Sequence, residues 1–197
     1  MERLLPKVEL ISITQDSERI IEEVGRVCYN SIPGNPSIIK NWIKSGHHSM
    51  VEFGHATFKL TNVSRALLAQ ITRHRLASFQ VRSQRYVDET SFDFVTPESI
   101  ADNEEATDIY LSLMGDIRAT YSKLLSLGIK KEDSRMVLPN ACTTQIMIGA
   151  NFREWRHILE LRLDKHAQKE IRDVSKLIYK ELIANAPNVF GDIEIIE

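Results

Sequence analysis

Apolar and polar residues alternate in three short stretches of the chain, and this pattern predicts strands. The stretches are residues 7–14 (KVELISIT), 52–62 (EFGHATFKLTN) and 143–150 (TTQIMIGA). Because the side chains of a strand point to its two faces in turn, a period of two places the apolar set on one face of a sheet. The residues from Arg82 to Val95 include β-branched and aromatic side chains without a helical period, and we interpret them as a strand or an extended hairpin.

Other segments repeat their apolar residues every three or four positions, which predicts amphipathic helices. The longest run extends from Ala106 to Leu124 and ends at Gly128, a residue type that commonly closes helices. Polar side chains that accept hydrogen bonds from helix amides indicate where further helices begin. On these signals we expect helices after Asp16, from residue 38 to Gly46, after Ser64, from near Glu132 to Pro139, and from Asn151 to Ala184 with a break near Asp164.

The order of these elements indicates the fold class. Strands and helices follow one another without a regular strand-helix-strand alternation, which favours an α+β fold over a doubly wound parallel sheet. The 197 residues are enough for one domain with a full core. We therefore expect residues 1–197 to form a single domain.

Charge and composition exclude several classes of protein. The formal net charge is −2, whereas proteins that coat nucleic acids or membrane surfaces usually carry a net positive charge. No stretch approaches the about 20 consecutive apolar residues of a membrane helix. Cys28 and Cys142 are the only cysteines, and they lack the spacing of disulfide frameworks or thiolate zinc sites. These observations predict a cytoplasmic protein with reduced thiols that binds neither membranes nor nucleic acids.

The most basic segment of the chain is RHRLASFQVRSQRYV, residues 73–87. It carries four arginines, and no carboxylate lies between Glu52 and Asp88. A guanidinium group binds phosphate or carboxylate through two parallel charge-assisted hydrogen bonds. Because the chain lacks the two common glycine-rich phosphate loops, GxGxxG and GxxxxGK[ST], we expect side chains to hold an anionic ligand. The alternative is a charged surface exposed to solvent.

This segment resembles RHRxxSxNxxSxR, the signature of the flavin-dependent thymidylate synthases. Six of the seven fixed positions match, and Gln80 stands in place of the usual Asn. Four further segments resemble recurring parts of that family in the same order, namely GRVCYNS at 25–31, GHHSMVE at 46–52, SRMVLPNACTT at 134–144 and LRLDKHAQKEI at 161–171. The likeness spans residues 25 to 185.

The resemblance implies both a fold and a reaction. The fold would be a single α+β domain with a central, mostly antiparallel sheet flanked by helices. The reaction would be the reductive methylation of dUMP to dTMP. Methylenetetrahydrofolate would be the carbon donor, and FAD, reduced by NADPH, the hydride carrier. Family members form homotetramers in which the FAD sites lie across subunits, and the resemblance implies the same here.

The resemblance also assigns roles to residues that bind the nucleotide. It places the activation of the pyrimidine on Arg162, within LRLD, without attack by a cysteine. From sequence spacing alone, Arg162 would be a helix-surface residue paired with Glu160 or Asp164. The dUMP set implied by the resemblance is Gln70, Arg73, Arg82, Ser83, Gln84, Arg85, Arg135 and Arg162.

The flavin set is implied in the same way. It consists of Ser49, Arg73, His74, Arg75, Asn151, Arg153 and His157, with His47 or His48 near the flavin and the folate. The choice between these two histidines stays open, because one residue is inserted before Ala56. Val81 departs from members that carry an acid there, and His157 stands where some relatives have Asn. Helix capping by itself also explains Asn151, with Glu154 at the third helical position reaching back to it.

Other interpretations of the same residues remain. A non-catalytic nucleic-acid-binding module would use residues 73–86, with Phe79 or Tyr86 stacking on bases. A flavoprotein without methylation activity is a third possibility. The histidines lack the spacing of a metal site, so we expect no catalytic metal. Neither cysteine has a neighbour that would lower the pKa of its thiol, which predicts inert thiols.

Overall fold

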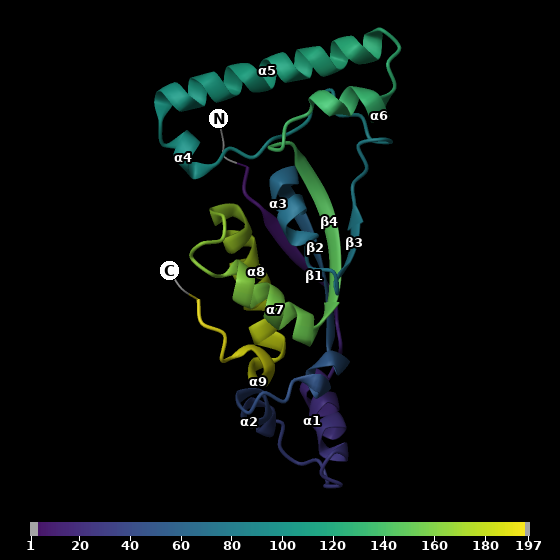
Figure 1. The fold of residues 1–197 in the computed structure, drawn as a ribbon, viewed down its shortest axis with the longest axis vertical. Helices are drawn as coiled ribbons and strands as arrows, with labels where there is room; N and C mark the ends of the chain where they lie inside the picture. The colour runs from purple at the N-terminus through teal and green to yellow at the C-terminus, as the bar shows by residue number, and fades with distance from the viewer. Residues whose placement is uncertain (1–3, 196–197) are drawn as a thin grey trace. The chain divides into compact units, whose positions relative to one another are not determined.

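The computed structural model of the chain describes residues 4–195 and has the expected α+β architecture (Figure 1). One antiparallel sheet contains four strands in the order β1-β2-β4-β3. The strands are β1 (Lys7–Ile13), β2 (His55–Ser64), β3 (Ser78–Val81) and β4 (Thr143–Asn151). The predicted α+β class with a mostly antiparallel sheet is therefore confirmed, as are the three strands that the alternating pattern indicated.

The contacts of the chain gather in two compact units. Among the described residues, unit 1 contains 4–7, 60–70 and 80–146, and unit 2 contains 8–59, 71–79 and 147–195. Each of the four strands contributes residues to both units. The helices and the candidate residues are therefore described unit by unit.

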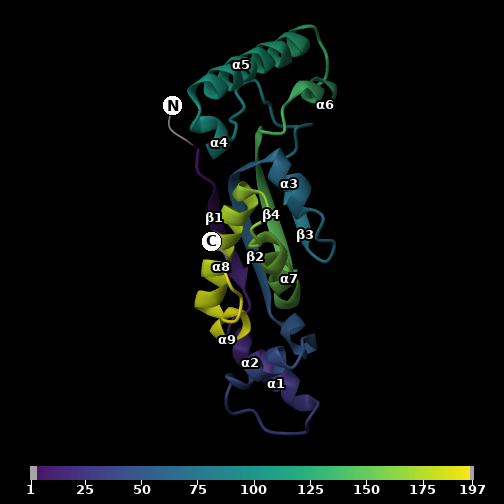
Figure 2. The ribbon, with the colours of Figure 1, turned by 60° about the vertical axis from the view of Figure 1, so that its left-hand side comes forward.

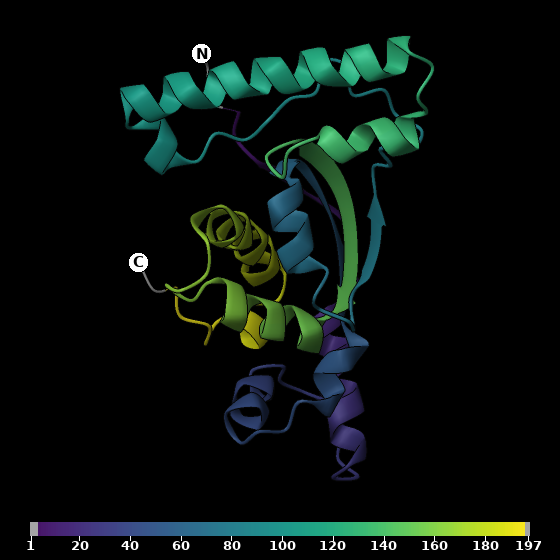
Figure 3. The same cartoon turned by 45° about the horizontal axis from the view of Figure 1, so that its top comes forward.

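The long helix α5 (Glu104–Ser126) dominates unit 1, and the short helices α4 (Glu98–Ala101) and α6 (Lys131–Ser134) pack against it (Figure 3). The side chain of Asn103 accepts a hydrogen bond from the amide of Ala106 and so caps the helix. Gly128, with φ +82°, follows its end as predicted. Unit 1 also holds the 3-10 turn η2 (Arg135–Val137) and most of α3 (Arg65–Ile71). Within residues 4–195, no helix combines the length and apolar character needed to cross a bilayer.

Unit 2 is mainly helical, and Figure 2 shows α7, α8 and α9 close together. Trp155 of α7 donates from Nε1 to the carbonyl of Ala56 in β2 at 3.0 Å, and its ring meets Phe58 edge to face. A Cβ atom on Gly54 would lie 2.3 Å from the Phe152 ring, so only glycine allows this approach. The helical elements are α1 (Ser17–Val27), α2 (Ile38–Lys44), η1 (Ser49–Phe53), α7 (Phe152–Arg162), α8 (Lys169–Asn185) and α9 (Pro187–Phe190).

Two of the three predicted helix caps form hydrogen bonds. Ser64 Oγ accepts from the amide of Leu67 at 3.0 Å, and Asn151 Oδ1 accepts from the amide of Glu154 at 2.8 Å. Asp16 precedes α1 as expected, but its backbone is left-handed, with φ 48° and ψ 34°, and its side chain makes no capping hydrogen bond. The helix therefore begins after Asp16 as predicted, but the predicted capping hydrogen bond of the Asp16 side chain is wrong.

The strand or hairpin predicted from Arg82 to Val95 is wrong. Strand β3 ends at Val81, and the next residues form turns in which the amide of Val87 bonds the Ser83 carbonyl and that of Phe92 bonds the Glu89 carbonyl. Among the described residues, this segment bonds β4 only near its two ends, where the amide of Arg82 bonds the Gln145 carbonyl and the amide of Thr143 bonds the Asp93 carbonyl, and an isolated bridge pairs Phe94 with Cys142. The β-branched and aromatic residues pointed to a strand, but side chains such as Glu89 and Phe92 turn inward, and this fixes the backbone in loops.

Candidate functional site

Two side chains of unit 2, those of Arg162 and Glu154, meet at the imidazole of His74. Arg162 donates from Nε to His74 Nε2 at 3.0 Å, and Glu154 Oε1 lies 3.5 Å from His74 Nδ1. His74 and Glu154 are both buried. A ring nitrogen that accepts a hydrogen bond cannot carry a proton, so a neutral His74 must carry its proton on Nδ1, the side of Glu154.

Burial sets the protonation states in this cluster. Desolvation, followed by repulsion from Arg162, His157 and Arg73, lowers the pKa of His74 to about 4. The imidazole is therefore neutral at neutral pH. Burial, with the neighbouring Arg73, also lowers the pKa of Arg162. Burial raises the pKa of Glu154, and His157 opposes this shift.

The R-H-R run after α3 directs its side chains to different environments. The amide of His74 bonds the Ile71 carbonyl and the amide of Ala77 bonds the His74 carbonyl, so the chain turns here. His74 is buried, whereas Arg73 and Arg75 are exposed. Among residues 4–195, no carboxylate forms an ion pair with Arg73 or Arg75. These two cations are available to an anionic ligand.

A polar cavity of about 590 Å³ lies in unit 2. It collects four of the candidate flavin and folate residues, together with Leu76, Arg156 and three glutamates, at positions 52, 154 and 160. The candidates are His48, Asn151, Arg153 and His157. Arg153 Nη1 pairs with Glu52 Oε1 at 2.6 Å. Arg156 is buried and held by Asp192, with contacts of 2.6 and 2.8 Å, and by the carbonyl of Val189.

A second, mainly apolar cavity of about 330 Å³ in unit 2 is lined by two further candidates, His47 and Ser49. Its wall includes the parallel rings of Tyr29 and Trp42, whose centroids are 6.2 Å apart at 9°. Cys28 also lines it. His47 lines this cavity and His48 lines the polar one. The choice of which histidine lies near the flavin and the folate therefore stays open.

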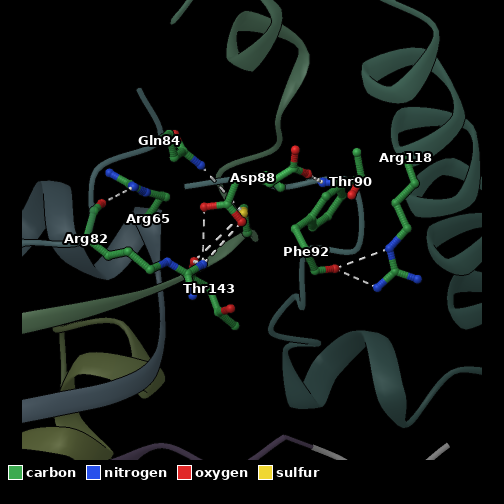
Figure 4. A network of polar contacts seen from close by, with 10 residues as sticks. Arg65, Arg82, Gln84, Asp88, Thr90, Phe92, Arg118 and Thr143 are labelled. Carbon is green, nitrogen blue, oxygen red and sulfur yellow. Dashed lines mark hydrogen bonds and ion pairs between the residues drawn. The ribbon is translucent and has the colours of Figure 1, made fainter. Parts of the chain in front are cut away.

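A network of polar contacts holds the segment after β3 in unit 1 (Figure 4). Arg82 Nη2 lies 3.2 Å from both carboxylate oxygens of buried Glu89 and donates to the Thr143 carbonyl at 2.8 Å. Arg65 donates to the Arg82 carbonyl at 2.8 Å. Burial raises the pKa of Glu89, although Arg82 and Arg65 oppose the shift. The Arg82 side chain therefore has partners within the protein.

The remaining nucleotide candidates of unit 1 gather near Glu132 and Cys142. Arg85 pairs through Nε with Glu132 Oε2 at 3.0 Å, and its amide bonds Ser83 Oγ at 3.2 Å. Arg135 donates to the Glu132 carbonyl at 3.2 Å. Gln84 is buried, with Nε2 3.6 Å from Cys142 Sγ. The last member of this set, Gln70, donates to the carbonyl of Ala66 within α3.

The two cysteines differ in environment. Burial, followed by the charge of Glu89, raises the pKa of the Cys142 thiol to about 11. This thiol stays protonated at neutral pH and is a poor nucleophile. Cys28 is exposed. Within the described part of the chain, no group of three or more His, Cys, Asp and Glu side chains is arranged to hold a metal ion.

Several contacts of the candidate site were not predicted from the sequence. We interpreted Glu154 only as part of the helix cap at Asn151, and nothing in its spacing pointed to His74, which lies 80 positions earlier. Glu89 and Asp192 were likewise not identified as partners of Arg82 and Arg156. An acidic residue next to a basic or apolar run only weakly indicates a buried ion pair, because most such acids are exposed to solvent.

The chain matches the family model described as "Thymidylate synthase complementing protein" over residues 9–188. It is 33% identical to a flavin-dependent thymidylate synthase of Mycolicibacterium gilvum (strain PYR-GCK), with 96% of this chain and 85% of the relative aligned. It is 31% identical to that of Corynebacterium efficiens, with 91% and 80% aligned.

Two solved structures share the fold. One is thymidylate synthase X of Helicobacter pylori with FAD and dUMP, at TM-score 0.79, 23% identity and coverage of 96% of this chain and 99% of the other. The other is the UMP/dUMP methylase PolB of Streptomyces cacaoi bound with 5-Br dUMP, at TM-score 0.86, 22% identity and coverage of 96% and 94%.

Proposed function

This chain belongs to the flavin-dependent thymidylate synthase family, and on that premise we propose that it converts dUMP to dTMP by reductive methylation. In this proposal methylenetetrahydrofolate donates the carbon and NADPH is the reductant. FAD, when bound, would act as the hydride carrier. The residues of the chain bind these ligands, orient them and stabilise charge on the pyrimidine.

The candidate flavin residues fit a dinucleotide with two phosphates. All seven belong to unit 2, and two of them, Arg73 and Arg75, are exposed cations without a carboxylate partner among residues 4–195. Cations of this kind are suited to phosphate oxygens. Asn151, Arg153 and His157 would hold the cofactor at the polar cavity, and Ser49 would do so at the apolar one.

The nucleotide candidates of unit 1 suit the phosphate of dUMP. Arg85 is exposed, and its ion-pair partner among residues 4–195 is the partly exposed Glu132 at 3.0 Å, so a phosphate can displace that carboxylate at small cost. Ser83 and Arg135 lie close to the same acid or to Arg85. Arg82 differs, because its guanidinium binds Glu89; we assign it the task of holding the loop that presents Ser83 and Arg85.

The observation that carries the proposal is the contact between Arg162 and His74. A neutral imidazole orients the guanidinium at Nε without adding a negative charge there. Arg162 can therefore stabilise the negative charge that develops on the pyrimidine as N3 loses its proton. No thiol attack is required, which agrees with the raised pKa of Cys142.

Assembly and location are part of the same proposal. We assign the chain a homotetrameric state with flavin sites shared across subunits, and a cytoplasmic location. The cavities of unit 2 measure about 590 and 330 Å³. FAD, dUMP and a folate together need more enclosing surface than these cavities give, which supports oligomerisation. Light scattering of the purified protein measures the number of subunits, and a monomer would contradict this part.

The test of the function uses the purified full-length protein. We expect flavin absorbance and formation of dTMP that requires dUMP, methylenetetrahydrofolate and NADPH together. A colourless protein that binds oligonucleotides with strong salt dependence would support the nucleic-acid-binding alternative instead. A flavoprotein that oxidises NADPH equally with and without dUMP, and forms no dTMP, would support the third possibility.

A further inference from the structure

The proposed function leaves one buried carboxylate of the site without a role. Glu154 lies in the first turn of α7 with 5% of its surface exposed. The helix cap at this point uses the backbone amide of Glu154 and the side chain of Asn151, so the carboxylate is not needed for capping. Burying a carboxylate is costly unless a partner compensates. The partner in this structure is His74, at 3.5 Å.

The imidazole of His74 links Glu154 to Arg162 through its two ring nitrogens. Nδ1 faces the carboxylate and Nε2 accepts from Arg162 Nε. In the other neutral tautomer, Nε2 would carry the proton, and two N–H groups would face each other across 3.0 Å. That arrangement would push the guanidinium away. Only the Nδ1–H tautomer supports the observed position of Arg162.

We propose that Glu154 is a positioning residue that, through His74, fixes the orientation of the Arg162 guanidinium. A carboxylate beside Nδ1 stabilises the proton on that nitrogen and leaves the lone pair of Nε2 directed at Arg162. The same logic governs histidines that bind metals, where a group on one ring nitrogen fixes the tautomer for the other. What Arg162 then does for the pyrimidine rests on the proposed function.

The other neighbours of His74 do not select its tautomer. The ring of His157 meets that of His74 edge to face, with centroids 5.7 Å apart, and Arg73 adds a positive charge. Both disfavour protonation of the imidazole, but neither offers an acceptor to Nδ1–H in the contacts of the described residues. Glu154 is the acceptor that can select the tautomer.

The first test reads the tautomer directly, in the protein without added substrates. The ¹⁵N chemical shifts of the His74 ring distinguish a protonated Nδ1 from a protonated Nε2. Glu154→Gln keeps a side-chain oxygen that can accept from Nδ1–H, so we expect the wild-type tautomer. Glu154→Leu removes the acceptor, and we expect the proton to move to Nε2 in a measurable fraction of molecules. If Glu154→Leu keeps the wild-type shifts, the proposal is wrong.

The second test separates positioning from loss of stability. We expect Glu154→Leu to lower kcat by a factor between about 10 and 100, the range for a small misplacement of a catalytic group, with a change in the KM for dUMP of less than about twofold. Glu154→Gln should restore most of kcat, and the exposed Glu23→Leu on α1 serves as the control for adding an apolar side chain. Equal kcat losses in Glu154→Gln and Glu154→Leu would overturn the proposal.

The two levels of inference can fail separately. If the wild type forms no dTMP, the proposed function fails, and the ring shifts still decide whether Glu154 fixes the tautomer. If the wild type is active but both variants keep the wild-type ring shifts and kcat, only the role of Glu154 is rejected. If Glu154→Leu does not fold, Glu154→Ala replaces it in both measurements, with the same expected loss of the Nδ1–H tautomer.

Discussion

Arg162 and His74 are 88 positions apart in the chain, and Arg162 Nε donates to His74 Nε2 at 3.0 Å. The partner of the guanidinium at this atom is a neutral ring and not a carboxylate. An acid in the place of His74 would bind Arg162 more strongly, but it would also offset the positive charge that, in the proposed function, stabilises the pyrimidine. The contact therefore orients the cation and preserves its charge.

The low pKa of His74 predicts a dependence of stability on pH. The pKa falls from an ordinary 6.5 to about 4 in the folded protein. Between these values the unfolded chain binds a proton that the folded chain does not, so the free energy of unfolding decreases as the pH falls from 6.5 towards 4. In urea unfolding at several pH values, the free energy of unfolding of His74→Gln should change less with pH than that of the wild type. Equal changes would contradict the assignment.

The buried carboxylate of Glu22 predicts a second effect of pH, at a different place in unit 2. Burial opposes its ionisation, but the amides of Gly34 and Asn35, at 2.8 and 2.9 Å, and the guanidinium of Arg26 outweigh burial and lower its pKa. This carboxylate stabilises the fold above its ordinary pKa of 4.5, and the contribution is lost as the pH falls through the lower folded value.

Glu22→Ala should lower the free energy of unfolding at neutral pH by about 1–3 kcal/mol, because two backbone amides lose their acceptor. The loop that follows α1 should also become more sensitive to proteolysis. Glu23→Ala, in the same helix but exposed, is the matched control and should change stability by less than about 0.5 kcal/mol. If both variants unfold alike, Glu22 does not hold the loop.

The network around Arg82 predicts that Glu89 stabilises unit 1. Glu89→Ala removes both carboxylate oxygens from Arg82 and should lower the free energy of unfolding. Breaking a fully buried ion pair costs about 3–5 kcal/mol, and we expect a smaller loss here because the Arg82 side chain is 33% exposed. Asp88→Ala is the control, because this side chain is 49% exposed. The affinity for dUMP, measured by calorimetry, should fall in the Glu89 variant, since the loop bearing Ser83 and Arg85 loosens. Unchanged stability and affinity would remove the loop-holding role assigned to Arg82.

Two glycines provide a matched test of packing. A Cβ on Gly54 would lie 2.3 Å from the Phe152 ring, whereas a Cβ on Gly115, inside α5, meets nothing within 4 Å. Gly54→Ala should therefore destabilise the protein by about 1–3 kcal/mol. Gly115→Ala should stabilise it by up to about 1 kcal/mol, because alanine favours the helix. Thermal unfolding measures both effects. If the unfolding midpoints of the two variants shift in the same direction, the close approach at Gly54 is not rigid.

Cysteine substitutions test the absence of a thiol nucleophile. The double variant with Cys28→Ala and Cys142→Ala should retain dTMP formation, because the Cys142 thiol has a pKa of about 11 and no activating base. Some loss of stability is expected, since Cys142 is fully buried beside Phe92 and Met114. Folded protein that binds dUMP and flavin but forms no dTMP would reopen covalent catalysis.

Periodicity and caps predicted most of the elements, and tertiary contacts decided the rest. The regular spacing from Ala106 to Leu124 predicted α5, because one apolar stripe must face a core. Residues 82–95 were mispredicted because the Glu89 side chain turns back to Arg82 within the segment, and because Phe92 packs with Met114 and Cys142, which no local pattern contains. The candidate arginines came from the resemblance, whereas the contact of Glu154 with His74 required the fold.

The most direct test of the central claim is the rate of dTMP formation by Arg162→Gln, measured in a single turnover with flavin and dUMP bound. Gln keeps a side-chain donor but removes the charge. We expect flavin absorbance close to that of the wild type and a rate at least about a hundredfold lower, the scale expected when one charge-stabilising donor is lost. Formation of dTMP at the wild-type rate would contradict the role of Arg162 as the cation that activates the pyrimidine.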